Sequence, residues 1–172
     1  MLLIKNVQIH DAINPNPYKG DILVENGKIA QIAADIAAPE GAEVVDASGL
    51  RAYPGFIDAH SHIGLDGYGI GFEGMDYNEM GDVVCPQLRG IDGVKAMDPA
   101  FRNAVEGGVT CVSTGPGSAN VLGGTFTAIK MVGKRVETMI VEEAVAMKCA
   151  FGENPKRCYK DKGNCTRMTT AY

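Results

Sequence analysis

A turn dipeptide, Pro54-Gly55, divides the sequence into two stretches with different hydrophobic patterns. The stretch before it contains short runs of valine, isoleucine and leucine separated by Asn, Pro and Gly, which is typical of β-strands and turns. The stretch after it alternates strand-like runs, glycine-rich loops and a helical segment, which favours a βα arrangement and a parallel sheet. We therefore expect residues 1–54 and 55–172 to form two different structural units.

The first stretch is predicted to be a small all-β unit. Residues 2–9 are apolar and β-branched, as expected for a strand. Asn26-Gly27 separates two apolar runs, and this pair indicates a hairpin because a type I′ turn needs positive φ at both central residues. Two further short strands are expected over residues 43–46 and 51–53.

The second stretch begins with a short strand over residues 56–60. Residues 61–93 are rich in Gly, Asp and Met without a clear period, so we expect a long loop that can include a short helix. Loops of that length inside a domain are usually functional or mobile. A helix is predicted to begin after Asp98 as N-cap, with Pro99 in its first position, and to end at Gly107-Gly108.

Strand-like runs and one glycine loop make up the rest of the chain. Residues 109–114 predict a buried strand, and residues 115–124, GPGSANVLGG, predict a loop. Residues 125–132 favour another strand, whereas residues 141–152 fit either a helix or a strand. The polar residues after Glu153 are typical of turns.

The segment from Asp58 to His62 is the candidate metal-binding segment. It holds two of the three histidines of the chain, and in a strand the side chains of Asp58, His60 and His62 share one face. Two imidazoles one pleat apart can both reach a metal ion at about 2.0–2.1 Å. Asp58 is placed either to be a third ligand or to accept a hydrogen bond from a ligand imidazole.

The composition argues against several classes of protein. A formal net charge of −5 disfavours a binder of nucleic acid or of anionic membranes, and no apolar run reaches the roughly 18 residues of a membrane span. The short, interrupted apolar start does not resemble a signal peptide, so a cytoplasmic location is expected. The odd number of irregularly spaced cysteines predicts reduced thiols, with a metal site at Cys158 and Cys165 as the alternative.

Several segments together resemble the beginning of a metal-dependent amidohydrolase. They are the N-terminal strand, the hairpin sequence NGKIAQI, a valine strand that ends in Asp-Ala-Ser-Gly, and the segment PGFIDAHSHIG. The resemblance covers residues 1–64 and is closest to the imidazolonepropionase and Xaa-Pro dipeptidase-like branch. It implies an α/β protein with a small β-sandwich built from both chain ends and a (β/α)8 barrel between them. It also implies that His60 and His62, on the first barrel strand, ligate a divalent metal.

The resemblance implies a further metal ligand, either a carboxylated lysine or a glutamate from a later barrel strand. The candidates are Lys148 and Glu153, of which Glu153 is slightly preferred. Lys148 lies in an apolar run where an unmodified ammonium is costly to bury, and Glu153 follows a glycine at the end of the same run. Zinc is the expected metal, with Mn²⁺ or Fe²⁺ as alternatives, because these ligand types suit all three.

The glycine loop is the candidate substrate loop. In the implied barrel it follows a strand, at the face where barrel active sites lie. Its candidate substrate-site residues are Gly115, Gly117, Ser118 and Asn120. An ordinary turn is the alternative interpretation of these glycines.

The chain is too short for the whole of the implied fold. A (β/α)8 barrel takes about 250 residues, whereas only residues 55–172 follow Pro54, and the third histidine, His10, lies in the β unit. We therefore expect an N-terminal fragment of an enzyme that hydrolyses non-terminal or cyclic C–N amide bonds with metal-activated water, inactive by itself. The expected partners are a small amide or dipeptide substrate, and a second copy or the missing C-terminal half.

Two other functions stay open. One is a non-catalytic β/α module that binds a metal or a partner. The other is a phosphate or nucleotide binder that uses residues 115–124, since exposed backbone amides of a glycine loop can cradle phosphate. That segment matches neither the G-x-G-x-x-G nor the Walker pattern.

Overall fold

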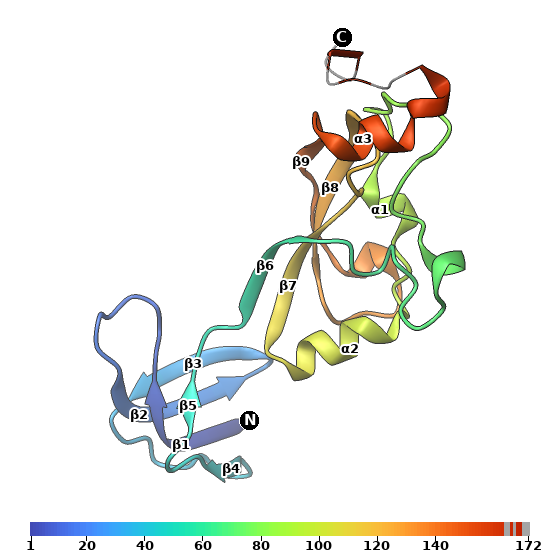
Figure 1. Cartoon of the computed structure of the whole chain (residues 1–172). Helices are drawn as coiled ribbons and strands as arrows, with labels where there is room; N and C mark the ends of the chain where they lie inside the picture. Colours follow the sequence, from blue (N-terminus) through green and yellow to red (C-terminus); the bar gives the residue numbers. More distant parts are fainter. Residues whose placement is uncertain (164–165, 167, 170–172) are drawn as a thin grey trace. The chain divides into compact units, whose positions relative to one another are not determined.

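The chain folds around two separate sheets (Figure 1). The computed structural model describes residues 1–163, 166 and 168–169. The chain divides into two units, Met1–Pro54 and Gly55–Tyr172, and each unit contains one sheet. Within the described part, no helix has the length and apolar character needed to cross a membrane.

The first unit is a mixed sheet. Its strands are β1 (Leu2–Ile9), β2 (Tyr18–Glu25), β3 (Lys28–Ala33), β4 (Glu43–Asp46) and β5 (Arg51–Ala52). β1 is antiparallel to β2 and parallel to β4 and β5, and β3 pairs with the other edge of β2. The predicted hairpin is confirmed, because Asn26 and Gly27 join β2 to β3 with φ values of 49° and 73°.

The second unit contains a four-stranded sheet in the order β6-β7-β8-β9. Its described elements are β6 (Phe56–Ser61), η1 (Phe72–Gly74), α1 (Gly90–Gly93), α2 (Pro99–Glu106), β7 (Val109–Thr114), β8 (Leu122–Lys130), η2 (Val136–Thr138), β9 (Ile140–Cys149), α3 (Glu153–Cys158) and η3 (Lys160–Lys162). The long loop predicted after β6 is confirmed, with the short turns η1 and α1 inside it.

β6, α2 and β7 form a βα unit. β6 and β7 pair in parallel, and α2 lies in the connection between them. Asp98 caps α2 as predicted, because its Oδ1 accepts a hydrogen bond from the amide of Ala100 at 2.8 Å. Phe101 of α2 packs in the main core with Val112 of β7 and Ile129 of β8. The fold is therefore α/β, and this βα unit agrees with the beginning of the implied barrel.

The expectation of a parallel sheet holds only for β6 and β7. β8 runs antiparallel to β7, and β9 runs antiparallel to β8. The reason is the length of the connection. Residues 115–121 alone join β7 to β8, whereas a parallel crossover needs about 10–12 residues or more. The last residues of the predicted glycine loop therefore belong to β8, which begins at Leu122.

Two segments near the end of the chain form a strand and a helix. The segment that fitted a helix or a strand is the strand β9. The prediction of turns after Glu153 is wrong, because Glu153–Cys158 forms α3. Pro155 does not prevent this helix, since it lies in the first turn, where backbone N–H groups have no partner within the helix.

Candidate metal centre

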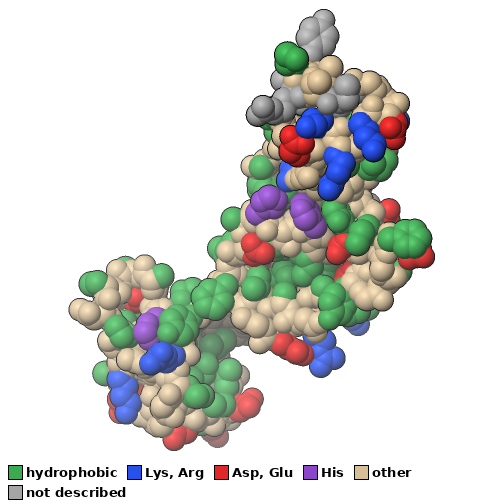
Figure 2. Space-filling model, viewed as in Figure 1, with side chains coloured by type: hydrophobic (Ala, Val, Ile, Leu, Met, Phe, Trp, Pro, Cys, Tyr) green, Lys and Arg blue, Asp and Glu red, His purple; other side chains and the backbone are tan. Residues whose placement is uncertain are grey.

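β6 places the two predicted histidine ligands side by side. His60 lies near the end of β6, and His62 follows its last residue. Their ring centroids are 5.5 Å apart and their planes meet at 85°. The side chain of His60 is exposed and that of His62 is half-buried. Figure 2 shows two neighbouring histidine side chains at the surface of the second unit.

His62 is held by two contacts that fix its ring. Its Nδ1 lies 2.7 Å from the carbonyl oxygen of Gly115. Because a carbonyl oxygen only accepts hydrogen bonds, Nδ1 is the donor in this contact, and in the neutral imidazole Nε2 then keeps its lone pair. The ring of Tyr77 stacks on the imidazole, with centroids 5.1 Å apart and planes within 15°. The arrangement leaves Nε2 as the nitrogen that suits a metal ligand.

His60 lies in a cavity that also contains Lys148. The cavity has a volume of about 320 Å³, and its lining includes Ser113, Phe126 and Cys149. The ring of Phe126 meets that of His60 edge to face, with centroids 5.3 Å apart, and Lys148 Nζ lies 5.9 Å from the centroid of Phe126. Burial lowers the pKa of the Lys148 ammonium, and the neighbouring Cys149 opposes this shift.

Asp58 and Glu153 lie outside this grouping of His60 with Lys148. Asp58 Oδ1 accepts a hydrogen bond from the backbone amide of His60 at 3.2 Å, so its observed contact is with the main chain. The pairing of β6 with β7 shifts between Asp58 and Ser61, which interrupts the regular alternation of side chains. Glu153 begins α3 and forms an ion pair with Lys156 at 2.7 Å.

The described residues supply part of a metal site. Among them, no group of three or more His, Cys, Asp or Glu side chains is arranged to hold a metal ion. Imidazole nitrogens are common zinc ligands, and a tetrahedral zinc site needs two ligands besides these two imidazoles. Cys165, one of the two cysteines considered above, lies outside the described residues.

The glycine loop is buried and tied to the long loop after β6. The amide of Gly117 donates to the carbonyl of Tyr77 at 2.6 Å, and that of Val121 donates to the carbonyl of Val83 at 2.8 Å. Ser118 is half-buried, while Asn120 is fully buried and its side-chain amide contacts loop carbonyls. Because these backbone amides already have partners, the observed loop conformation favours positioning of His62 over the cradling of phosphate.

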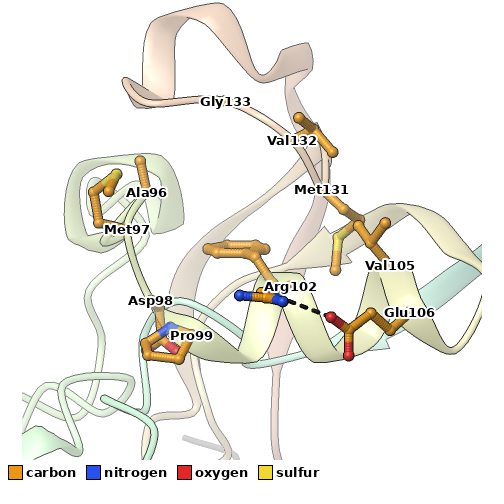
Figure 3. Close-up of a pocket in the computed structure, with 11 residues that line it drawn as sticks. Ala96, Met97, Asp98, Pro99, Arg102, Val105, Glu106, Met131, Val132 and Gly133 are labelled. Carbon is orange, nitrogen blue, oxygen red and sulfur yellow. Dashed lines mark hydrogen bonds and ion pairs between the residues drawn. The ribbon is translucent and has the colours of Figure 1, made fainter.

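A larger cavity lies along α2 and is mostly apolar. Its volume is about 490 Å³, and Met97, Val105 and Met131 contribute to its lining. Figure 3 shows the ion pair between Arg102 and Glu106 beside it, at 2.9 Å. None of the predicted site residues lines this cavity. The histidine pair therefore stays the candidate centre.

Sequence reasoning missed Tyr77 and Phe126. Tyr77 lies in the long loop after β6, and no local pattern distinguishes it from the other aromatic residues of that loop. Phe126 lies on β8 and contacts both histidine rings. An alternating pattern predicts that such a residue faces inward, but it does not identify the histidines as its neighbours.

Comparison with known proteins finds similar hydrolases. The chain is 36% identical over 170 residues to amidohydrolase tasK of Hapsidospora irregularis, a match that covers 89% of this chain and 17% of that protein. A crystal structure of an amidohydrolase from Thermotoga maritima has a TM-score of 0.91 and 44% identity, over 99% of this chain and 45% of that one. A dihydroorotase from Aquifex aeolicus is 48% identical over 62 residues, which are 36% of this chain and 14% of the dihydroorotase. No protein-family profile matches the chain.

The chain spans less than half the length of each of these three relatives. Their names agree with the resemblance at the level of the superfamily. None of the three is named as an imidazolonepropionase or an Xaa-Pro dipeptidase. Assignment to that narrower branch therefore stays a prediction.

Proposed function

Because the chain belongs to the metal-dependent amidohydrolase superfamily, we propose that it contributes the first two metal ligands, His60 and His62, to an enzyme that hydrolyses amide bonds. The observation that carries the proposal is the pair of adjacent imidazoles, with His62 fixed by the carbonyl of Gly115. A hydrolase acting on C–N bonds agrees with relatives named amidohydrolase and dihydroorotase.

In this proposal, each site residue of the chain has its own role in binding or orienting the metal ligands. A divalent metal at such a site polarises the amide carbonyl and lowers the pKa of water. His60 and His62 bind it, zinc being the proposed ion, and Gly115 orients His62 through Nδ1. Lys148 is the better candidate for a third ligand than Glu153, because it shares a cavity with His60 whereas Glu153 pairs with Lys156. Carboxylation of the Lys148 amine would convert it into an anionic ligand.

The proposed substrate is a small amide, a cyclic amide or a dipeptide. The catalytic carboxylate and the remaining ligands are proposed to lie in residues beyond this chain, because the described residues hold no group of three or more His, Cys, Asp or Glu side chains arranged to hold a metal ion. We therefore propose that the 172-residue chain is inactive by itself and that a longer protein or a second chain completes the site.

Zinc titration of the chain by calorimetry tests the proposed ligands. His60→Ala and His62→Ala should each weaken zinc binding by more than about tenfold, the loss that is typical even for residues that only orient a ligand. His10→Ala is the matched control, because His10 belongs to the first unit, and it should leave zinc affinity unchanged. Equal affinity in all four proteins would contradict the proposed ligands.

A hydrolysis assay tests the proposed reaction separately. The zinc-loaded chain should not hydrolyse cyclic amides, whereas a protein that also carries the rest of the barrel should do so and should lose this activity with His60→Ala. Zinc binding without hydrolysis by that longer protein would favour a non-catalytic binding module. Turnover by the chain alone would show that these residues suffice.

A further inference from the structure

Asn120 and Tyr159 form a buried polar clamp, here called the Asn120–Tyr159 clamp, around the carbonyls of Glu79 and Asp82. Asn120 Nδ2 donates to these carbonyls at 2.8 and 2.7 Å and lies 2.8 Å from the Tyr159 hydroxyl. That hydroxyl lies 2.5 and 2.7 Å from the same two carbonyl oxygens. Asn120 is 0% exposed and Tyr159 is 1% exposed. The clamp therefore joins the glycine loop, the long loop and the segment after α3.

The clamp holds the part of the long loop that begins at Tyr77. The amide of Gly117 donates to the carbonyl of Tyr77 at 2.6 Å, and the amide of Ala119 donates to Asn78 Oδ1 at 3.0 Å. The two loops approach so closely that a Cβ on Gly117 would lie 2.5 Å from Tyr77 Cδ2. Such a distance does not occur between real side chains, so glycine is required at this contact.

Both loops that the clamp holds also contact the imidazole of His62. The glycine loop provides the carbonyl of Gly115, and the long loop provides the ring of Tyr77. We propose that Asn120 and Tyr159 are positioning residues for His62, which keep Nδ1 protonated and Nε2 directed to a metal by fixing these two loops. The inference rests on the proposed ligand role of His62.

Packing alone does not explain why a polar side chain occupies the buried position of Asn120. Asn120 Oδ1 is buried without a hydrogen-bond partner among the described residues, which carries a free-energy cost that an apolar residue would avoid. The Nδ2 of this side chain nevertheless contacts the carbonyls of Glu79 and Asp82 in the long loop and the hydroxyl of Tyr159. A buried hydrogen-bond network of this kind favours one arrangement of the two loops. A metal ligand needs such fixed surroundings to keep its orientation.

The tautomer of His62 in the zinc-free chain tests the proposal directly. Long-range ¹H–¹⁵N spectra at a pH well above the ordinary histidine pKa distinguish protonated Nδ1 from protonated Nε2. The native chain should show Nδ1 protonated, and Tyr159→Phe should give a mixture of both forms. Tyr18→Phe is the matched control, because its hydroxyl bonds to Asp11 in the first unit, and it should keep the native signals.

Zinc affinity provides the second readout. Tyr159→Phe should weaken zinc binding about tenfold, as is typical for residues that orient a ligand. Unchanged His62 signals in a folded Tyr159→Phe chain would overturn the proposal, whatever its stability. The spectra need no zinc, so failure of the chain to bind zinc would contradict the proposed function and leave the positioning test intact.

Substitutions at Tyr77 keep the test decisive if Tyr159→Phe does not fold. Tyr77→Phe retains the stacked ring and should preserve the His62 tautomer. Tyr77→Leu removes the ring, leaves the clamp in place, and should give the mixture expected for Tyr159→Phe. Identical His62 signals in Tyr77→Leu and Tyr77→Phe would show that the long loop does not position the imidazole.

Discussion

At the scale of single residues, the ionisation of Tyr159 makes the stability of the folded chain depend on pH. Burial raises the pKa of Tyr159 to about 12 from its ordinary value of 10.0. The folded chain thus retains the phenol proton more strongly than the unfolded chain, so this contribution to stability is complete below pH 10.0 and is lost as pH rises to about 12. Denaturant unfolding across that window should show a steeper loss of unfolding free energy in the native chain than in Tyr159→Phe. Parallel pH profiles for the two proteins would contradict this.

The sequence identifies the proposed histidine ligands more readily than the residues that surround them. His60 and His62 belong to one short strand, so residue type and spacing suffice to propose them as a pair. The contacts of His62 with Gly115 and Tyr77 come from two other segments. Such contacts depend on how distant segments pack, and no local pattern encodes them. The same limit applies to the choice between Lys148 and Glu153.

At the scale of elements, the start of α2 depends on one carboxylate. Asp98 is 4% exposed, and its two oxygens accept hydrogen bonds from the amides of Ala100 and Tyr68. Asp98→Ala should lower the unfolding free energy by about 1–2 kcal/mol, the upper part of the range for loss of an N-cap, because the hydrogen bond from Tyr68 is lost as well. Asp92→Ala, which removes an exposed ion pair with Arg89, should cost less than about 1 kcal/mol. Equal losses in urea unfolding would argue against the capping role.

Elements with strong local signals were predicted, and those set by distant pairing were not. Asn26-Gly27 and Asp98-Pro99 dictate their own backbone conformations, so the hairpin and α2 follow from the sequence. The segment of β9 is compatible with two structures until β8 pairs with it. α3 lacks a side-chain N-cap hydrogen bond and has Pro155 in its first turn, which makes its sequence resemble a turn.

At the scale of the whole molecule, the edges of the second sheet predict association. β6 and β9 are the outer strands of that sheet, and Ile57 and Val145 on them are 73% and 45% exposed. Exposed apolar edge strands pair readily with other chains. The chain should therefore self-associate with rising concentration in sedimentation velocity experiments, and Ile57→Lys should reduce this association.

Ile13→Lys is the control for that experiment. Ile13 is 87% exposed in a loop of the first unit, so the substitution adds the same charge at an exposed position that is not part of the second sheet. It should leave the association unchanged. A chain that stays monomeric at all concentrations would show that the edges of β6 and β9 do not recruit a second copy.

The contact between His62 and Gly115 also bears on the order of events during folding. These residues are 53 positions apart in the chain, so the imidazole acquires its fixed orientation only after β6 and the glycine loop have come together. The proposed ligand His62 is therefore held in its observed orientation only in the native state. A metal ion that binds the native chain in preference to the unfolded one adds its binding free energy to the stability of the folded chain by mass action.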